Sequence, residues 1–214
     1  FSYSSKEQQF AARPFSDDPT QKNHIQDMLL DNNNRLWLGT DNGLHILDQA
    51  GASQHIYEEP YITDSLSSNR ILTLAIDNEN TLWVGTRLGL NYRSLNAPQS
   101  LQKGWTSIYN NNLSNHSLLS NTVRKISLDD AGRIWIGTNR GLSVTNLQRK
   151  QVAIYRATDS QTYNNYILSL TEQTSGALWV GTLAGLYKFD GVSAMPIPEL
   201  AKDVIYDSLQ IDNF

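Results

Sequence analysis

Two arginine side chains stand in matching short segments of the sequence and are well suited to hold a ligand. Arg87 and Arg140 each lie within two residues of a Gly-Thr pair, and Asp41 and Asn139 lie in equivalent segments. The guanidinium group offers a fixed fork of donors that fits a carboxylate, a sulfate or sugar hydroxyls. We therefore expect these four residues to line a ligand-binding surface. The alternative is that both arginines are solvated turn residues.

Four asparagines are a second candidate group, because each precedes a tryptophan by 14 residues: Asn23, Asn69, Asn121 and Asn165. Their amide groups could bind sugar hydroxyls, which adds Asn69 and Asn121 to the candidate ligand contacts. The alternative is that each asparagine fastens an incoming loop by bonding to its backbone. We favour the loop role, because a ligand rarely needs the same residue from every repeat.

The histidines and the acidic turns give weaker signals. No pair among His24, His45, His55 and His116 has the spacing of metal ligands, and we expect these residues at the surface or in turns. A calcium loop that began at Asp31 would need a glutamate at its twelfth position, where Asn42 stands. Aspartate and asparagine also favour tight turns. We therefore predict no metal site.

Catalysis is not indicated by the sequence either. Neither a Gly-x-Ser-x-Gly nucleophile elbow nor a Gly-x-x-x-x-Gly-Lys phosphate loop occurs. We expect no catalytic residue, no cofactor and no enzymatic activity.

Composition narrows the possible partners. The net charge is −4 and is spread without blocks, so no basic surface for nucleic acid is expected. Apolar runs are far shorter than the roughly 20 residues that cross a bilayer, which argues against membrane insertion by this segment. The absence of cysteine fits the periplasm and the cytosol equally. Because the chain starts at Phe1 without a methionine, we expect a piece of a longer protein.

A sequence repeat positions the candidate residues. The pattern Trp-x-Gly-Thr-x-x-Gly-Leu occurs four times, and it begins at Trp37, Trp83, Trp135 and Trp179. Each copy predicts a strand, a tight turn closed by glycine, and a second strand. The tryptophans are 46, 52 and 44 residues apart, whereas the step from asparagine to tryptophan is constant. Insertions therefore fall in loops, as expected of a fixed unit with tolerant connections.

The repeat predicts a β-propeller. A further strand is marked by an Ile-Tyr pair at residues 56–57, 108–109 and 154–155, which gives four antiparallel strands per unit. A β-solenoid or a single sandwich fits less well, because solenoid periods are shorter and sandwiches do not repeat their sequence. We predict an all-β protein with four complete four-stranded blades plus partial strands of flanking blades, as a fragment of a larger propeller.

The expected boundaries divide residues 1–214, a single propeller segment, into six parts. An outer strand of a preceding blade and a first strand of a following blade flank the four blades. The parts in chain order are 1–19, 20–60, 61–112, 113–158, 159–200 and 201–214. Because strands at both ends lack their blades, we expect self-association or pairing of the two terminal strands.

Packing roles are expected for several repeated residues. Each repeat tryptophan should fill the wedge between adjacent blades, and the glycine two residues later should leave room for a neighbour's ring. The threonine should satisfy backbone groups at the turn. We expect Trp105 to be ordinary blade packing. The insertion at residues 96–104 should touch another domain or subunit, or nothing, on the face away from the candidate site.

The repeats resemble a known family, the two-component regulator propeller repeats. The resemblance rests on the tryptophan pattern, on the aspartate-rich hairpins and on an upstream element seen at residues 65–69 and 117–121. It covers residues 24–212, although the fourth blade has Glu172-Gln173 where others have an apolar residue and aspartate. In that family the repeats form seven-bladed propellers, often in tandem, ahead of a β-sandwich, a membrane helix and a histidine kinase or diguanylate cyclase.

The resemblance implies a periplasmic ligand-sensing and signal-input propeller of a bacterial two-component or cyclic-di-GMP receptor anchored in the inner membrane. A small molecule or an oligosaccharide is the implied ligand, and the remainder of the receptor is the implied partner. The alternative is a protein–protein or dimerisation scaffold without a ligand site of its own.

Overall fold

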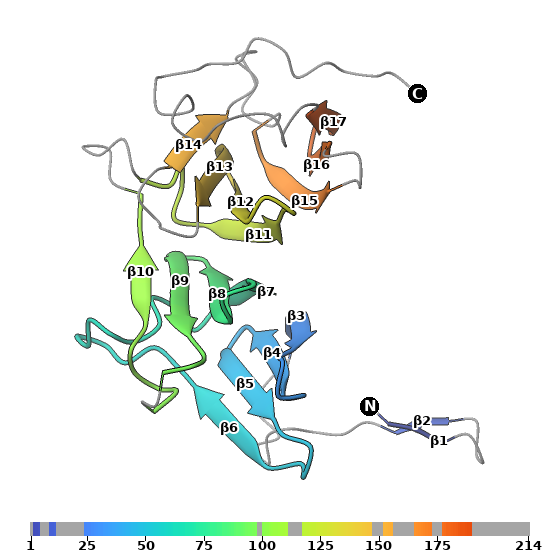
Figure 1. Cartoon of the computed structure of the whole chain (residues 1–214), viewed down its shortest axis with the longest axis vertical. Coiled ribbons are helices and arrows are strands. Elements are labelled where there is room, and N and C mark those ends of the chain that lie inside the picture. Colours follow the sequence, from blue (N-terminus) through green and yellow to red (C-terminus); the bar gives the residue numbers. More distant parts are fainter. Residues whose placement is uncertain are drawn as a thin grey trace.

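The computed structural model describes residues 2–4, 9–11, 24–97, 100–110, 117–146, 152–155, 165–172 and 177–189. Within these residues there are seventeen strands and no helix. Four antiparallel sheets follow one another along an arc in chain order, as Figure 1 shows. The all-β prediction is therefore confirmed.

Each of the first three sheets has four strands in chain order, and the fourth has three described strands. The first sheet contains β3 (Ile25–Leu30), β4 (Leu36–Thr40), β5 (Gly43–Leu47) and β6 (Ser53–Ile56). The second contains β7 (Ile71–Ile76), β8 (Thr81–Thr86), β9 (Gly89–Ser94) and β10 (Thr106–Ile108). The third contains β11 (Val123–Leu128), β12 (Arg133–Thr138), β13 (Gly141–Asn146) and β14 (Val152–Tyr155). The fourth contains β15 (Ile167–Glu172), β16 (Leu178–Thr182) and β17 (Gly185–Phe189).

The first strands of the sheets lie side by side. β3 is beside β7, β7 is beside β11, and β11 is beside β15. Sheets that meet along their first strands and fan outward through the fourth are the blades of a propeller, so the predicted fold is confirmed. We refer to the sheets as blades one to four.

The N-terminal segment differs from the expected single outer strand. Two short strands, β1 (Ser2–Ser4) and β2 (Gln9–Ala11), pair with each other in antiparallel fashion. In Figure 1 this hairpin lies apart from blade one, because only four residues separate the two short strands and so favour a local hairpin over a distant edge. Residues 201–214, expected to form a first strand, lie outside the described residues.

The repeat tryptophans fill the wedges between blades, as predicted. Trp37 of blade one shares a buried cluster with Ile71 and Leu74 of blade two. Trp83 is buried with Val123 and Ile126 of blade three, and Trp135 is buried with Ile167 and Leu170 of blade four. Trp179 of blade four is only partly buried.

In blades one, two and three, the glycine two residues after the tryptophan makes room for a methyl group and not for a ring, which corrects the sequence expectation. A Cβ on Gly39 would lie 2.7 Å from Cγ2 of Ile71. A Cβ on Gly137 would lie 2.5 Å from Cγ2 of Ile167. Both partners are β-branched residues that open the first strand of the next blade. The glycine and the β-branched residue therefore form one contact that sets the spacing between adjacent blades.

The threonine of each repeat closes its turn as predicted. In blade one the Thr40 hydroxyl donates to the Gly43 carbonyl over 2.8 Å and accepts the backbone N–H of Asn42 over 3.0 Å. The same pair of bonds occurs at Thr86, Thr138 and Thr182. The turns that carry the candidate residues are therefore built alike in all four blades.

The aspartate-rich hairpins are structural, which agrees with the turn interpretation, and they show a contact that the sequence did not reveal. The Trp37 indole N–H donates to Asp31 over 2.8 Å, and the Trp83 and Trp135 indoles donate in the same way to Asp77 and Asp129. We name this contact the Asp–Trp lock. It fastens the hairpin between the first two strands to the ring that fills the wedge.

Two sequence expectations about blades one and two were wrong. The insertion at residues 96–104 contacts the neighbouring blade, because the Gln102 side chain donates to the Tyr57 carbonyl over 2.7 Å and accepts the Tyr57 N–H over 3.4 Å. An extended amide side chain thus replaces a strand partner. Trp105 is buried with Trp37, as expected. His45, expected at the surface or in a turn, is buried on β5, because residues on both faces of this strand are buried.

Candidate functional site

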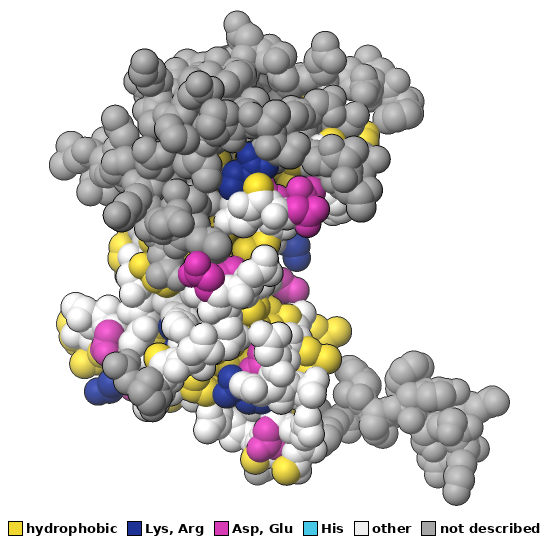
Figure 2. Space-filling view, viewed as in Figure 1, with side chains coloured by type: hydrophobic (Ala, Val, Ile, Leu, Met, Phe, Trp, Pro, Cys, Tyr) yellow, Lys and Arg dark blue, Asp and Glu magenta, His cyan; other side chains and the backbone are white. Residues whose placement is uncertain are grey.

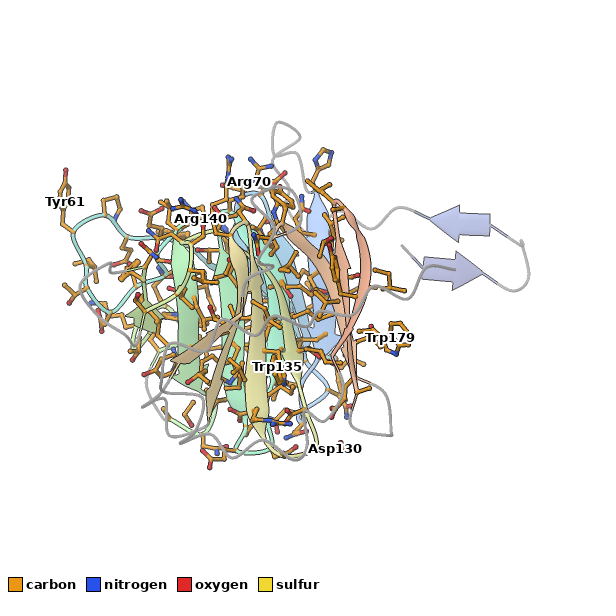
Figure 3. The ribbon with its side chains drawn as sticks, turned by 90° about the horizontal axis from the view of Figure 1, so that it is seen from above. Tyr61, Arg70, Asp130, Trp135, Arg140 and Trp179 are labelled. Carbon is orange, nitrogen blue, oxygen red and sulfur yellow. The ribbon has the colours of Figure 1, made fainter. Side chains whose placement is uncertain are left out.

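The candidate site is the face that carries the turns between the second and third strands and the loops that enter each first strand. Arg70 and Arg140 lie on this face, and Asp130 of a hairpin lies on the opposite one (Figure 3). The turns of the candidate residues and the hairpins between the first two strands therefore lie at opposite ends of the blades. We call this face the mouth, because the first strands meet at its centre.

Asp41 is held by residues from two blades. Its carboxylate pairs with Nε of Arg70 over 3.1 Å and accepts Nε2 of Gln26 over 3.3 Å. Nδ1 of His24 lies 3.5 Å from the same carboxylate. Arg70 precedes β7, whereas His24 and Gln26 flank the start of β3. Asp41 therefore bridges the first two blades and already has a cationic partner.

Asn139 occupies the equivalent turn in blade three and binds a different partner. Its side-chain oxygen accepts Nε of Arg124 over 2.5 Å. The Arg124 guanidinium also lies over the Tyr166 ring, 4.2 Å from its centroid. Such cation–π contact orients the planar group and offsets part of its lost hydration. Arg124 is therefore fixed by an amide and a ring, neither of which carries a negative charge.

The backbone of Arg87 bonds to Arg70 of its own blade and to Thr122 at the start of blade three. Its N–H donates to the Arg70 carbonyl over 3.2 Å, and its carbonyl accepts the Thr122 hydroxyl over 3.3 Å. Its side chain is exposed. Burial lowers the pKa of Arg124, and the charges of Arg87 and Arg70 lower it further. The Arg87 backbone therefore lies next to Arg70, and the charges of both residues act on Arg124. The sequence analysis singled out neither Arg70 nor Arg124.

The remaining predicted residues have separate places. Arg140 is exposed on the same face, and its backbone N–H donates to Thr138. Asn69 accepts the Glu58 N–H over 2.7 Å, and Asn121 accepts the Asn110 N–H over 2.5 Å. Both asparagines fasten the incoming loop, as the favoured interpretation held. A ligand contact by any of the six residues remains a prediction.

A polar chain crosses the first strands below the mouth. Asp27 accepts the Thr73 hydroxyl and the Leu74 N–H, each over 3.0 Å, and its Oδ2 lies 3.4 Å from Nζ of Lys125. Thr73 in turn accepts the Ile126 N–H over 3.3 Å. Each of these strands has a register shift at this level, and in β7 and β11 an N–H beside the shift is turned toward the preceding blade. The side chain of one blade therefore satisfies the bulge of the next.

The sequence carried a signal for the residues that were missed. Arg70 stands one position after a fixed asparagine, and Arg124 stands three positions after one. Asp27 and Lys125 stand four positions after theirs. These offsets place the four residues on the first strand or directly before it, where adjacent blades meet. Comparing the same offsets across the blades would have found these residues.

The described residues contain neither a cluster of metal-ligating side chains nor a membrane-spanning helix. No set of three His, Cys, Asp or Glu side chains that could hold a metal occurs within the described ranges. The same ranges contain no helix long and apolar enough to span a bilayer. A hollow of about 540 Å³ lies beside blade one, lined by Arg35, Ile46, Gln54, Leu101 and Gln102 among others. It lies outside the mouth.

Solved structures share the fold at low sequence identity. The extracellular domain of a hybrid two-component system from B. thetaiotaomicron is 22% identical with a TM-score of 0.50, over 86% of this chain and 30% of that one. PorZ, a surface component of the type-IX secretion system of Porphyromonas gingivalis, is 18% identical with a TM-score of 0.62, over 87% and 28%. An ancestral GH74 enzyme is 17% identical with a TM-score of 0.57, over 84% and 24%.

These neighbours include sensor-type, surface and enzymatic propellers, so their likeness shows the fold alone. The chain spans about 30% of the length of the sensor domain named above. No curated protein sequence matches the chain. Three segments, residues 21–42, 65–87 and 117–140, match the family described as two component regulator propeller. They coincide with the first-strand and tryptophan-strand parts of blades one, two and three. Three of the four blades therefore carry segments that match the two component regulator propeller family.

Proposed function

We propose that this chain is part of the extracytoplasmic signal-input region of a bacterial two-component or cyclic-di-GMP receptor, and that it binds a small ligand at the mouth without catalysing a reaction. The observation that carries the proposal is the family match together with a mouth whose turn residues differ in every blade. The six predicted residues Arg87, Arg140, Asp41, Asn139, Asn69 and Asn121 all lie in the turns and loops of this face.

The identities of the turn residues favour recognition over a purely structural role. The threonine bonds below each turn are the same in all blades, so the fold accepts any residue that suits the turn. The residues above it nevertheless include an acid in Asp41, a base in Arg87 and an amide in Asn139. Such chemical variety on a uniform scaffold is how repeat proteins build asymmetric binding surfaces.

A scaffold function is the second candidate, and it rests on exposed apolar residues at the open edge of blade one. Ile25, Met28 and Leu30 of β3 are 44%, 64% and 65% exposed. Figure 2 shows hydrophobic side chains gathered over the blades formed by β3–β10. This edge could pair with a flanking blade of the longer protein or with a second copy of the chain.

Two measurements on the full gene product test the receptor proposal. Protease added to intact spheroplasts should cleave a tag placed in this region, whereas a cytoplasmic tag should survive. Receptor output across a panel of candidate nutrients should fall when Arg87→Ala and Arg140→Ala are combined, at unchanged protein abundance. Protection of the tag, or unchanged output with every inducer, would overturn the proposal. Concentration-dependent sedimentation abolished by Met28→Asp and Leu30→Asp would favour the scaffold.

A further inference from the structure

The hollow of about 540 Å³ beside blade one has its first wall in the outer half of that blade. Gln54 on β6 pairs with Ile46 on β5, and the side chains of such a pair point to the same side of a sheet. Ile46 and Ile56 belong to the buried cluster between blades one and two, whereas Gln54 is exposed. The hollow therefore has an apolar floor and a polar rim.

The second wall of the hollow is the insertion of blade two at residues 96–104. Leu101 and Gln102 line the hollow from this side. The Trp105 indole donates to the Leu101 carbonyl over 2.9 Å, and Gln102 is bonded to the backbone of Tyr57 in blade one. Both walls are therefore fixed by protein contacts before a ligand arrives, which lowers the entropy cost of binding.

Two opposite charges line the same hollow. Arg35 directly precedes β4, and Asp48 directly follows β5. Because Leu36 pairs with Leu47, Arg35 and Asp48 are opposite each other at the end of the blade away from the mouth. Within the described residues the guanidinium pairs with Asp31 and not with Asp48. The hollow therefore presents a cation and an anion on neighbouring strands.

Both charged groups keep atoms for a further partner. Nε of Arg35 pairs with Asp31 over 2.6 Å, and among the described residues its two terminal nitrogens have no hydrogen-bond partner. Oδ1 of Asp48 accepts the Ala52 N–H over 2.8 Å, and its Oδ2 has no partner in the same part of the chain. The two terminal nitrogens can hold a carboxylate, and the carboxylate of Asp48 can hold an ammonium group.

Arg133 of blade three is the matched case of an arginine enclosed by the fold. Arg35 and Arg133 each pair through Nε with the aspartate four residues earlier, and each lies 5.5 Å from the ring centroid of its repeat tryptophan. The Arg133 side chain is 3% exposed, whereas that of Arg35 is 24% exposed. Thr81 and Ala177 stand at this position in the other blades, so the fold does not require arginine there. The exposed part of Arg35 is therefore available to a ligand.

We propose that this hollow binds a zwitterionic ligand with an apolar body, an apolar α-amino acid. Arg35 holds its carboxylate, and Asp48 holds its ammonium group. The apolar side chain lies on the floor of Ile46 and Ile56, beside Leu101. The volume is within the range of about 300–1,000 Å³ that small-molecule sites occupy. The site goes beyond the proposed function, because it lies outside the mouth and requires no ligand there.

The test titrates the 214-residue chain with L-leucine and follows the backbone amide resonances by NMR. Saturable shifts are expected at Gln54 and Leu101. Leucinamide, which lacks the carboxylate, and 4-methylpentanoate, which lacks the ammonium group, should each bind at least tenfold more weakly than leucine. Glycine, which lacks the apolar side chain, should be weakened to the same extent.

Two variants separate the roles of the charged residues. Arg35→Gln should weaken leucine binding at least tenfold but leucinamide binding less than twofold, because the amide has no carboxylate to lose. Asp48→Asn should weaken leucine binding at least tenfold but 4-methylpentanoate binding less than twofold, and it keeps an oxygen for the Ala52 N–H. Lys103→Ala removes an exposed charge of the insertion that does not line the hollow, and it should change leucine affinity less than twofold.

The outcomes either support the site or overturn it. No saturable shift with leucine, or equal affinity for leucine and its two analogues, would overturn the proposal. Equal weakening of leucine and leucinamide by Arg35→Gln would show that the arginine acts through the fold and does not hold the carboxylate. Should Arg35→Gln lower the melting temperature, Asp48→Asn and the analogue series still decide, since Asp48 is exposed and the analogues leave the chain unchanged.

Discussion

The two ends of the blades differ in how far their side-chain contacts repeat from one blade to the next. At the hairpin end, blades one, two and three use the same contact, in which an aspartate accepts the indole N–H of the repeat tryptophan. At the mouth, the equivalent turns hold Asp41, Arg87 and Asn139, and each has a different partner. One end repeats its chemistry blade by blade, and the other changes it at every step.

The difference distinguishes contacts that the fold requires, at the hairpin end, from residues that are free to recognise a ligand, at the mouth. The Asp–Trp lock buries a carboxylate, and burial opposes ionisation of Asp31. Hydrogen bonds from the Trp37 indole, from the backbone and side chain of Arg35 and from the Asn33 backbone outweigh that cost, so the pKa of Asp31 lies below its usual value. Such a site tolerates few substitutions. The mouth residues are largely exposed or half-buried and carry no such constraint.

Breaking the Asp–Trp lock should have the largest effect on stability, and most of all in blade three. Asp129 accepts the Trp135 indole and also pairs with Arg133, which is 2% exposed, over 2.5 Å. Asp129→Ala should therefore lower the free energy of unfolding by about 3–5 kcal/mol, because it leaves a buried charge without its carboxylate. Urea denaturation measures the change.

The matched comparison is Asp77→Ala, since Thr81 stands where Arg133 would be. This variant should cost less, about 1–3 kcal/mol for unsatisfied hydrogen bonds. Asp130→Ala, an exposed neighbour, should be nearly neutral. Equal losses for the alanine variants of Asp129 and Asp77 would show that the arginine pair adds nothing.

Blade one should show a pH dependence that comes from its buried histidine. His45 is 3% exposed and stacks on His55 with ring centroids 4.2 Å apart. Burial, and secondarily His55, lowers the pKa of His45 to about 4. Because the unfolded chain binds a proton near pH 6.5 and the folded one does not, stability is full above pH 6.5 and falls toward pH 4. The loss reaches about 3 kcal/mol.

The measurement is urea denaturation between pH 5 and 7, for the wild type and for His45→Leu. The leucine variant should flatten the pH dependence in this window. An unchanged slope would assign the titration to other groups.

The spacing contact between blades should give a smaller loss that one neighbour can restore. Gly39→Ala places a Cβ 2.7 Å from Cγ2 of Ile71 and should cost about 1–3 kcal/mol through overpacking. Ile71→Ala removes that methyl group, so the double variant should be more stable than the sum of the two single losses predicts. Thermal unfolding of all four proteins measures the coupling, and strict additivity would contradict the contact.

The mouth arginines should have the smallest effect on folding. Arg87→Ala with Arg140→Ala should change the free energy of unfolding by less than about 0.5 kcal/mol, because both side chains are exposed turn residues. Calorimetric titration of the receptor's inducer should show a loss of about 2–4 kcal/mol in affinity. A large drop in melting temperature would show that the mouth residues also stabilise the fold. The two ends of the blades would then not differ in their structural role.

The sequence predicted the fold well because its periodic part is structural. The constant step from asparagine to tryptophan identified the blades, and the threonine and loop-fastening asparagine behaved as expected. The Asp–Trp lock was missed, since the aspartate looked like turn chemistry alone. Its partner is six residues away on the next strand, and only the closed hairpin brings them together.

The site was predicted in part. Turn position alone identified Arg87, Asp41 and Asn139, because the repeat fixes where turns fall. The partners Arg70 and Arg124 depend on how adjacent blades rotate against each other, which sequence spacing within a single repeat does not contain. Equivalent turn positions alone predicted that Arg87 acts together with Arg140. In the structure, the charge of Arg87 acts instead on Arg124, together with that of Arg70.

The partly buried Trp179 gives the protein a built-in optical signal. Trp37, Trp83, Trp105 and Trp135 are at most 2% exposed, so their emission should be blue-shifted and protected from a water-soluble quencher such as acrylamide. Trp179 is the member of the repeat series that water can reach. Its fluorescence therefore reports on whether anything covers the face of blade four that points away from blade three. The spectrum of Trp179→Phe would identify the contribution of Trp179 to the emission.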